Sequence, residues 1–140
     1  MSYAIDDLKT GMSASFAKIV TERDIALFGE ISGDTNPVHF DEDFASKTPF
    51  KGRIAHGVLG ASFISTVLGM EMPGPGTIFL GLNIRFKAPV HIGDTVTAIC
   101  TVREVVAEKR RVVFDCACKV GDTVVIEGEA TVMPPQRPIG

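Results

Sequence analysis

The sequence predicts a single α+β domain in which an antiparallel sheet curls around one buried helix. Three observations predict this fold class. Helical spacing dominates the first half of the chain, whereas apolar and polar residues alternate from Thr77 onward. One helical segment, which begins near Gly57, is apolar on nearly every side and therefore suits the centre of a domain. The 140 residues fit one domain and are too few for two ordinary ones.

The first predicted helix spans residues 22–32. Thr21 followed by Asp24 has the form of a capping box, with Asp in the place of the more usual Glu. Gly33 is a typical residue to end a helix, because glycine adopts the left-handed conformation without a steric penalty. Between these signals the apolar residues recur at helical spacing, namely Ile25, Phe28 and Ile31.

The segment 34–39, with the sequence DTNPVH, follows this helix directly. Pro37 fixes its own backbone angle and pushes Asn36 toward an extended conformation, so we expect a bend here and no regular helix. After the bend, Asp41 can cap a short helix that runs to about Lys47.

A second long helix is predicted to begin at Gly57 and to run for about a dozen residues. It has almost no charged face. Its apolar residues are Val58, Leu59, Ala61, Phe63, Ile64, Val67 and Leu68. Because a helix that is apolar all round is a buried one, we expect the sheet to cover it.

The second half of the chain reads as strands. Segments 96–103 and 111–120 alternate apolar and polar residues, as half-buried antiparallel strands do. Gly121 and Asp122 form a predicted hairpin turn into a third alternating segment, 124–132. With the segment after the central helix, these give a run of about four long strands that follows the helices.

No repeat or low-complexity tract divides the chain. We therefore predict one domain over residues 1–134. The Pro- and Gly-containing segment 135–140 is predicted to be a flexible tail.

Composition excludes several classes of function. A net charge of −3 gives no basic field for nucleic acid. The longest apolar stretch, 57–72, is interrupted by Glu71 and falls short of the ~20 residues that span a bilayer, so no membrane segment is predicted. Three cysteines and no recognisable export signal predict reduced thiols in the cytoplasm.

The candidates for binding an anionic ligand are local basic groups: Lys51 with Arg53, Arg85 with Lys87, and residues 109–111.

Asp34 and His39 are the candidate catalytic residues of the bent segment. A bend there can aim a carboxylate and an imidazole at one water, so that one group removes a proton while the other returns one. Histidine suits this work because its ordinary pKa of ~6.5 lies near operating pH. An Asp after a helix-ending Gly is also a common turn former, and a His near Pro is often a surface residue. Spacing alone leaves these readings open.

A wider pattern around the bend carries a family resemblance. Residues 28–39, FGEISGDTNPVH, followed by Ala45, resemble the signature of the MaoC-like (R)-specific enoyl-CoA hydratases of the hydratase 2 type. The similarity continues through residues 54–57, IAHG, and through 86–90, FKAPV, with Gly93-Asp94. It covers nearly the whole chain.

The resemblance implies a hot-dog fold, in which the sheet wraps a central helix and two protomers pair as a homodimer. It implies a hydro-lyase that adds water reversibly and syn to a trans-2-enoyl-CoA, giving an (R)-3-hydroxyacyl-CoA. By carry-over, Asp34 and His39 activate the water and Asn36 is a further polar member of the site. The chain is long enough for one hot-dog unit only. Because relatives with two such units accommodate bulkier substrates, the resemblance favours short to medium acyl chains.

Further site residues are expected around the central helix. Gly57 is assigned as the backbone N–H donor to the thioester oxygen, because a helix N-terminus stabilises developing negative charge. Ser62 lies one turn further on, where it is either an ordinary helix serine or a hydroxyl that assists the site. His56 lies directly before the helix, where it either caps the helix or touches the CoA. Both are substrate-binding candidates. Arg85 and Lys87 are predicted to hold the CoA phosphates. No cofactor is expected, since CoA is part of the substrate, and the His and Cys spacing gives no metal site.

Two alternatives remain at this stage. A hot-dog acyl-CoA thioesterase would bind the same class of ligand but direct water at the carbonyl carbon. A non-catalytic acyl-CoA-binding subunit would keep the fold without the chemistry. The pair Asp34 and His39 favours hydration over both.

Overall fold

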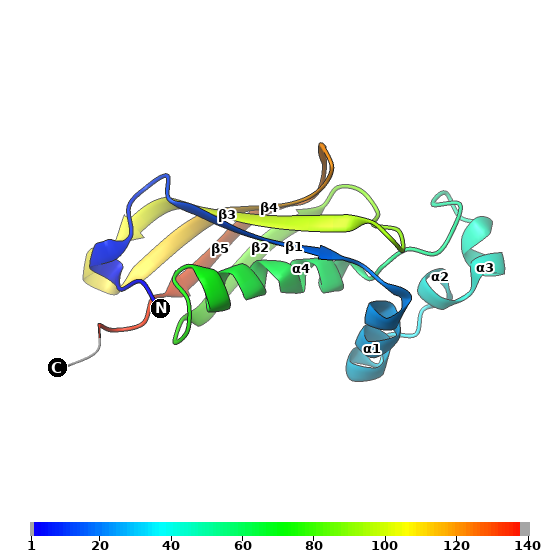
Figure 1. The fold of residues 1–140 in the computed structure, drawn as a ribbon, viewed down its shortest axis with the longest axis horizontal. Coiled ribbons are helices and arrows are strands. Elements are labelled where there is room, and N and C mark those ends of the chain that lie inside the picture. The colour runs from blue at the N-terminus through cyan, green and yellow to red at the C-terminus, as the bar shows by residue number, and fades with distance from the viewer. Residues whose placement is uncertain (1, 138–140) are drawn as a thin grey trace.

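The computed structural model describes residues 2–137 and contains one antiparallel sheet with a helix lying along one face (Figure 1). The five strands are hydrogen-bonded in the order β1-β3-β4-β5-β2. Their bounds are Ser13–Ile19 for β1, Ile78–Phe86 for β2, Thr95–Val106 for β3, Arg111–Val120 for β4 and Thr123–Met133 for β5. This arrangement confirms the α+β class and the antiparallel sheet around a central helix.

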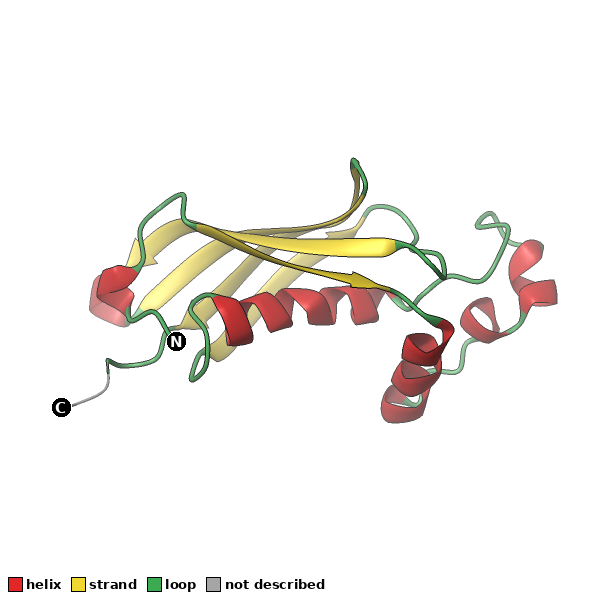
Figure 2. Ribbon diagram, viewed as in Figure 1, coloured by secondary structure: helices red, strands yellow, loops and turns green. Residues whose placement is uncertain are grey.

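The helices form two groups (Figure 2). The central helix α4 spans Gly57–Thr66 and continues as the π-helical turn η2, Val67–Glu71. The other group stands beyond the N-terminal end of α4 and consists of α1 (Glu22–Ser32), α2 (Pro37–Phe40) and α3 (Glu42–Ser46). Two short 3-10 turns complete the helices, η1 at Ile5–Asp7 and η3 at Ala107–Lys109.

The predicted signals at the ends of α1 are confirmed. The Thr21 hydroxyl accepts a hydrogen bond from the Asp24 N–H at 3.1 Å, and the Asp24 carboxylate accepts from the Thr21 N–H at 3.0 Å. Gly33 ends the helix with a φ of 78°, which an L-residue adopts only under strain. The predicted cap of α3 is also present, since the Asp41 carboxylate accepts from the Phe44 N–H at 3.1 Å. Local signals thus place the chain that leads to the site.

The core lies between α4 and the inner face of the sheet. The predicted alternation in β3 and β4 is confirmed, because every second residue is buried. From the helix side, Phe63, Ile64, Val67 and Leu68 are each 5% exposed or less. These residues join one cluster with the inward side chains Val96, Ala98, Cys100, Val102, Val112 and Phe114. Burial of these side chains on both layers holds the helix in place.

Two expectations were wrong. The strands do not all follow the helices, because β1 precedes α1 and pairs with β3 at one edge of the sheet. Its sequence, SASFAKI, mixes small and polar residues, so its alternation carries little hydrophobic contrast. The central helix is not buried all round either. Val58 is 60% exposed, on a side of α4 that the protomer leaves open.

Residues 135–137 of the predicted tail are described, and the Arg137 guanidinium lies 2.8 Å from the Asp7 carboxylate. Residues 138–140 lie outside the described part of the chain. Within residues 2–137, none of the helices has the length and apolar character needed to cross a membrane.

Candidate active site

The segment from Asp34 to His39 is held by its own side chains. The Asp34 N–H donates to the Ser32 hydroxyl at 3.1 Å, and the Asp34 carboxylate accepts from the Asn36 N–H at 3.2 Å. The Asn36 side-chain oxygen caps α2 by accepting from the Val38 N–H at 3.2 Å. The expectation of no regular helix here was wrong by one turn, because Pro37 occupies the first position of α2, where its missing N–H costs nothing.

His39 is buried on α2, with 8% of its surface exposed. Its Nδ1 lies 2.8 Å from the Ile54 carbonyl oxygen. Because a carbonyl only accepts, Nδ1 carries the hydrogen and Nε2 is left as an acceptor. Burial lowers the pKa of His39 below its usual value, and the neighbouring His56 lowers it further, against the raising effects of the Ile54 bond and of Asp34. The ring is therefore a neutral base at neutral pH.

The Asp34 carboxylate and a His39 ring nitrogen lie close together. Ligand atoms of Asp34, His39 and His56 all lie within 4.8 Å of one another. Two acceptors at such a separation can share one water, because each hydrogen bond spans about 2.7–3.2 Å and a water donates at a wide angle. The pair can thus hold one water by both of its hydrogens.

The same three residues are poorly arranged to hold a metal ion. The rings of His39 and His56 are stacked, with centroids 3.9 Å apart and planes inclined by 28°. His39 Nδ1 and His56 Nε2 both donate to carbonyl oxygens, so neither nitrogen has a lone pair free for a metal. The donor set fits a water better than a metal.

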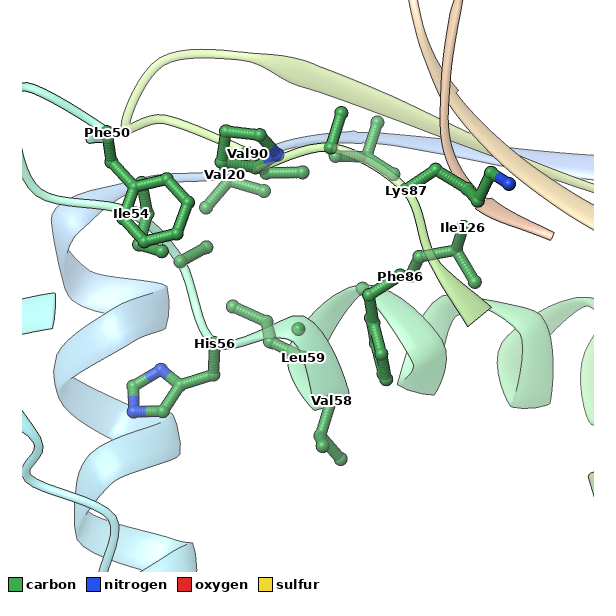
Figure 3. Close-up of a pocket in the computed structure, with 16 residues that line it drawn as sticks. Val20, Phe50, Ile54, His56, Val58, Leu59, Phe86, Lys87, Val90 and Ile126 are labelled. Carbon is green, nitrogen blue, oxygen red and sulfur yellow. The ribbon is translucent and has the colours of Figure 1, made fainter. Parts of the chain in front are cut away.

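Gly57 is the first residue of α4, where backbone N–H groups have no partner within the helix and the helix dipole is positive. A Cβ at this position would lie 2.8 Å from the Phe86 ring. Glycine is therefore required for Phe86 to pack against the start of the helix (Figure 3). The Gly57 N–H is a suitable donor for an oxygen that gains negative charge.

A cavity of about 460 Å³ opens beside Gly57 (Figure 3). Its walls come from Phe50, residues 54–60 and residues 86–90, with Val20, Val96 of β3 and Ile126 of β5. Most wall residues are apolar, among them Phe50, Ile54, Leu59, Phe86, Val90 and Ile126. Lys87 lines one side, with its ammonium 3.5 Å from the Glu127 carboxylate. The cavity suits a largely apolar ligand whose polar oxygen reaches the helix N-terminus.

The other predicted site residues lie at different places. Ser62 is exposed on α4, donates to the Leu59 carbonyl at 2.6 Å and does not line the cavity. Arg85 lines a separate depression on the sheet, together with Arg103 and Glu129. Of the two predicted phosphate-binding residues, Lys87 alone lies at the cavity beside Gly57. The structure therefore brings Asp34, His39, Gly57 and Lys87 to one end of α4.

Arg53 has a role that the sequence did not indicate. Its side chain donates to the His39 carbonyl at 2.8 Å and pairs with Glu22 of α1 at 2.8 Å. Its backbone N–H donates to the Glu42 carboxylate of α3 at 3.3 Å. In the sequence, the basic pair Lys51 and Arg53 is a candidate anion site. In the fold, Arg53 instead joins α1, α2 and α3 next to residues 34–39. Its partners lie 11 to 31 residues away, so no local pattern marks them.

Comparisons with known proteins agree with this geometry. The family described as MaoC like domain matches residues 7–129. An (R)-specific enoyl-CoA hydratase of Rhodospirillum rubrum is 58% identical over 94% of this chain and 92% of that protein. A 3-hydroxybutyryl-CoA dehydratase of Methylorubrum extorquens is 45% identical over 94% of this chain and 84% of that protein.

A solved structure is similar over most of its length. The R-hydratase PhaJ1 of Pseudomonas aeruginosa, in its unliganded form, superposes with a TM-score of 0.90 at 39% identity, covering 96% of this chain and 86% of that one. The chain belongs to the MaoC-like domain family and has its hot-dog fold.

Proposed function

We propose that the protein is an (R)-specific enoyl-CoA hydratase, which adds water reversibly to trans-2-enoyl-CoA to give (R)-3-hydroxyacyl-CoA. The observation that carries the proposal is that ligand atoms of two acceptors, Asp34 and His39, lie within 4.8 Å of each other and of His56, which directly precedes the helix N-terminus at Gly57. The names of the hydratase and dehydratase relatives support the same reaction class.

The geometry supports a mechanism with one water. Asp34 and the neutral His39 accept hydrogen bonds from the two hydrogens of this water. As the water oxygen attacks Cβ of the enoyl group, one of these two residues takes a single proton, and the other hydrogen stays on the new hydroxyl group. Negative charge moves to the thioester oxygen, where the Gly57 N–H and the dipole of α4 stabilise it. Neither acceptor holds a spare proton at rest, so the proton that Cα receives is one that the water supplied. Delivery from the same side gives syn addition.

The cavity beside Gly57 supports the proposed substrate class. An acyl thioester presents apolar carbons with one polar carbonyl, which matches apolar walls next to one N–H donor. We propose that Lys87, and more distantly Arg85, interact with the CoA phosphates. The predicted preference for short to medium acyl chains is part of the same proposal.

Product analysis of the purified protein tests the proposed function. Incubation with trans-2-enoyl-CoA esters of increasing chain length should consume the enoyl thioester and yield the (R)-3-hydroxyacyl product, as shown by chiral chromatography. Release of free CoA without hydration would instead identify a thioesterase. Binding of the esters without any product would identify a non-catalytic subunit.

We propose that catalysis needs no cofactor, because proton transfer and charge stabilisation account for the whole reaction. Turnover should be unchanged after dialysis against EDTA, and a loss that added metal restores would contradict this. The proposed cytoplasmic location has the support of Cys100, Cys116 and Cys118, which are buried free thiols.

We also propose that the protein is a homodimer. Strand β2 pairs with β5 on one side, and its other edge is open. Five large apolar side chains of this strand are between 39% and 54% exposed: Ile78, Phe79, Leu80, Leu82 and Phe86. Val58 and Met70, from α4 and η2, are 60% and 66% exposed. A second copy that pairs along β2 would cover an open edge that otherwise invites aggregation.

A further inference from the structure

His56 is a buried ring packed among aromatic side chains, with 3% of its surface exposed. It stacks on His39 with centroids 3.9 Å apart. Phe28 of α1 lies 4.8 Å away and Phe40 of α2 lies 5.8 Å away, both measured between ring centroids. Figure 3 shows the ring turned away from the cavity and toward α1. These apolar and aromatic surroundings would suit a phenylalanine ring equally well.

One polar contact distinguishes this ring from a phenylalanine. The His56 Nε2 lies 2.9 Å from the Asp34 carbonyl oxygen, and because that oxygen only accepts, Nε2 carries the hydrogen and donates. The other nitrogen, Nδ1, is buried without a hydrogen-bond partner among residues 2–137. A buried acceptor without a partner destabilises a fold. Histidine at this position is therefore best explained by the bond to Asp34.

That bond completes the fixation of the Asp34 backbone. The Asp34 N–H is already held by the Ser32 hydroxyl at 3.1 Å, and His56 holds the carbonyl on the other side. The direction of the exposed carboxylate depends on this backbone. His56 also stacks on His39 and precedes Gly57 in the chain. The His56 side chain thus contacts Asp34 and His39, and its backbone is joined to Gly57. These are the three groups that the proposed reaction requires to be aligned.

Two other roles fit the geometry less well. His56 is the N-cap residue of α4, yet its side chain makes no cap hydrogen bond. His56 is one of the residues that line the cavity, but its ring points away from the cavity space (Figure 3). A direct contact with CoA, as the sequence suggested, would require the ring to leave its three aromatic neighbours.

We propose that His56 is a positioning residue, which aligns Asp34 and His39 with Gly57 by donating from Nε2 to the Asp34 carbonyl. The expected effect of His56 on the rate of hydration rests on the proposed hydratase function. The alignment itself is a property of the fold and is measurable without turnover.

Two substitutions separate the hydrogen bond from the ring. His56→Phe keeps an aromatic ring of similar size and removes the donor, whereas His56→Gln keeps an N–H donor at comparable reach and removes the ring. His91→Phe, at an exposed histidine of the segment before β3, is the control. We expect His56→Phe to lower kcat ~10- to 100-fold with KM nearly unchanged, the size of effect that small misplacement of a catalytic group produces. His56→Gln should stay within ~3-fold of wild type, since the bond to the carbonyl is kept.

Amide hydrogen exchange gives a readout that does not depend on activity. In His56→Phe, exchange in residues 33–40 should be faster than in wild type, whereas exchange in β3 and β4 should be unchanged; His56→Gln should resemble wild type. If the wild-type protein has no hydratase activity, the proposed function is wrong. The exchange pattern would still test whether His56 positions Asp34 and His39. Unchanged exchange in His56→Phe, equal kcat in both variants, or a raised KM with kcat intact would overturn the proposal.

Discussion

At the scale of single residues, Asp34 and His39 are expected to act as one unit, because in the proposed mechanism both accept hydrogen bonds from the same water. Asp34→Asn and His39→Gln should each lower kcat by ~10²–10⁴, and the double variant should be little worse than the worse single one. His39→Gln should also lose some stability, since His39 is buried and bonded to Ile54. Steady-state kinetics with thermal melts measure both effects. A single variant that keeps more than about a tenth of turnover, a loss too small for an essential proton-transfer group, would exclude the mechanism.

The pH dependence of kcat/KM reports the same pair in the free enzyme. Burial lowers the pKa of His39 from the usual 6.5, so its neutral, base form persists to lower pH than that of an exposed histidine. We expect the acidic limb of the kcat/KM profile to fall below pH 6.5.

The lowered pKa of His39 also affects stability. As the pH falls, the unfolded chain takes up the proton before the folded protein does. The contribution of His39 to stability is therefore full above pH 6.5 and is lost as the pH drops through the pKa of His39 in the folded protein. Denaturant titrations across the range separate unfolding from loss of base. An acidic limb of the kcat/KM profile above pH 6.5 would contradict the lowered pKa of the buried His39 ring.

Sequence reasoning identified the candidate catalytic residues but not the residues that hold them in place. Asp34 and His39 stand in one short motif, and Gly57 is marked by the start of an apolar helix. The contacts of Arg53 with His39 and of His56 with Asp34 join residues 14 and 22 positions apart. They exist only because α1 and α2 pack at the N-terminal end of α4, which is a property of the fold and not of any local pattern.

At the scale of elements, the predictable parts are those with strong local signals. The capping box of α1 and the alternation of β3 and β4 appear in the structure as expected. β1 was missed because an edge strand needs few large apolar residues when one side faces solvent. The exposed side of α4 at Val58 was missed because the pattern that marks a buried helix does not say whether the same chain or another covers it.

The packing of α1 on α2 gives a test of how elements align the site. A Cβ at Gly29 would lie 2.5 Å from the Phe40 ring and 3.3 Å from the Asp34 carbonyl oxygen. Gly29→Ala should therefore push α1 and α2 apart, at a cost of ~1–3 kcal/mol in the free energy of unfolding. Gly69→Ala is the matched control, because its Cβ would meet nothing within 4 Å.

Activity distinguishes the two glycine variants further. Displacement of Phe40 moves the segment that carries Asp34 and His39, so kcat of Gly29→Ala should fall ~10-fold or more. Gly69→Ala should keep wild-type kcat and be equally stable or more stable by ~0.5–1 kcal/mol. Denaturant titrations and kinetics on both proteins provide the measurements. Equal behaviour of the two variants would show that the contact between α1 and α2 does not align the site.

At the scale of the whole molecule, the apolar surface is unevenly distributed. The outer face of the sheet carries charged side chains, such as Arg103 paired with Asp115 and Glu129. The edge at β2 instead exposes a row of large apolar side chains beside the open side of α4. Contiguous apolar surface of this kind marks a protein interface, since monomers keep such patches small. The asymmetry points to one edge of the sheet as the contact between two copies.

We expect the protein to be a homodimer at micromolar concentration, and light scattering would show its mass directly. Leu82, in the middle of β2, is 42% exposed and should be covered by the partner strand. Leu82→Lys places a charge in that interface, so the dimer should dissociate or weaken strongly because a buried charge without a partner is costly. Ile19→Lys is the matched control, because Ile19 is 55% exposed at the end of β1, the opposite edge of the sheet. This control should remain a dimer. A monomeric wild type, or dissociation of both variants alike, would show that β2 is not the edge at which two copies meet.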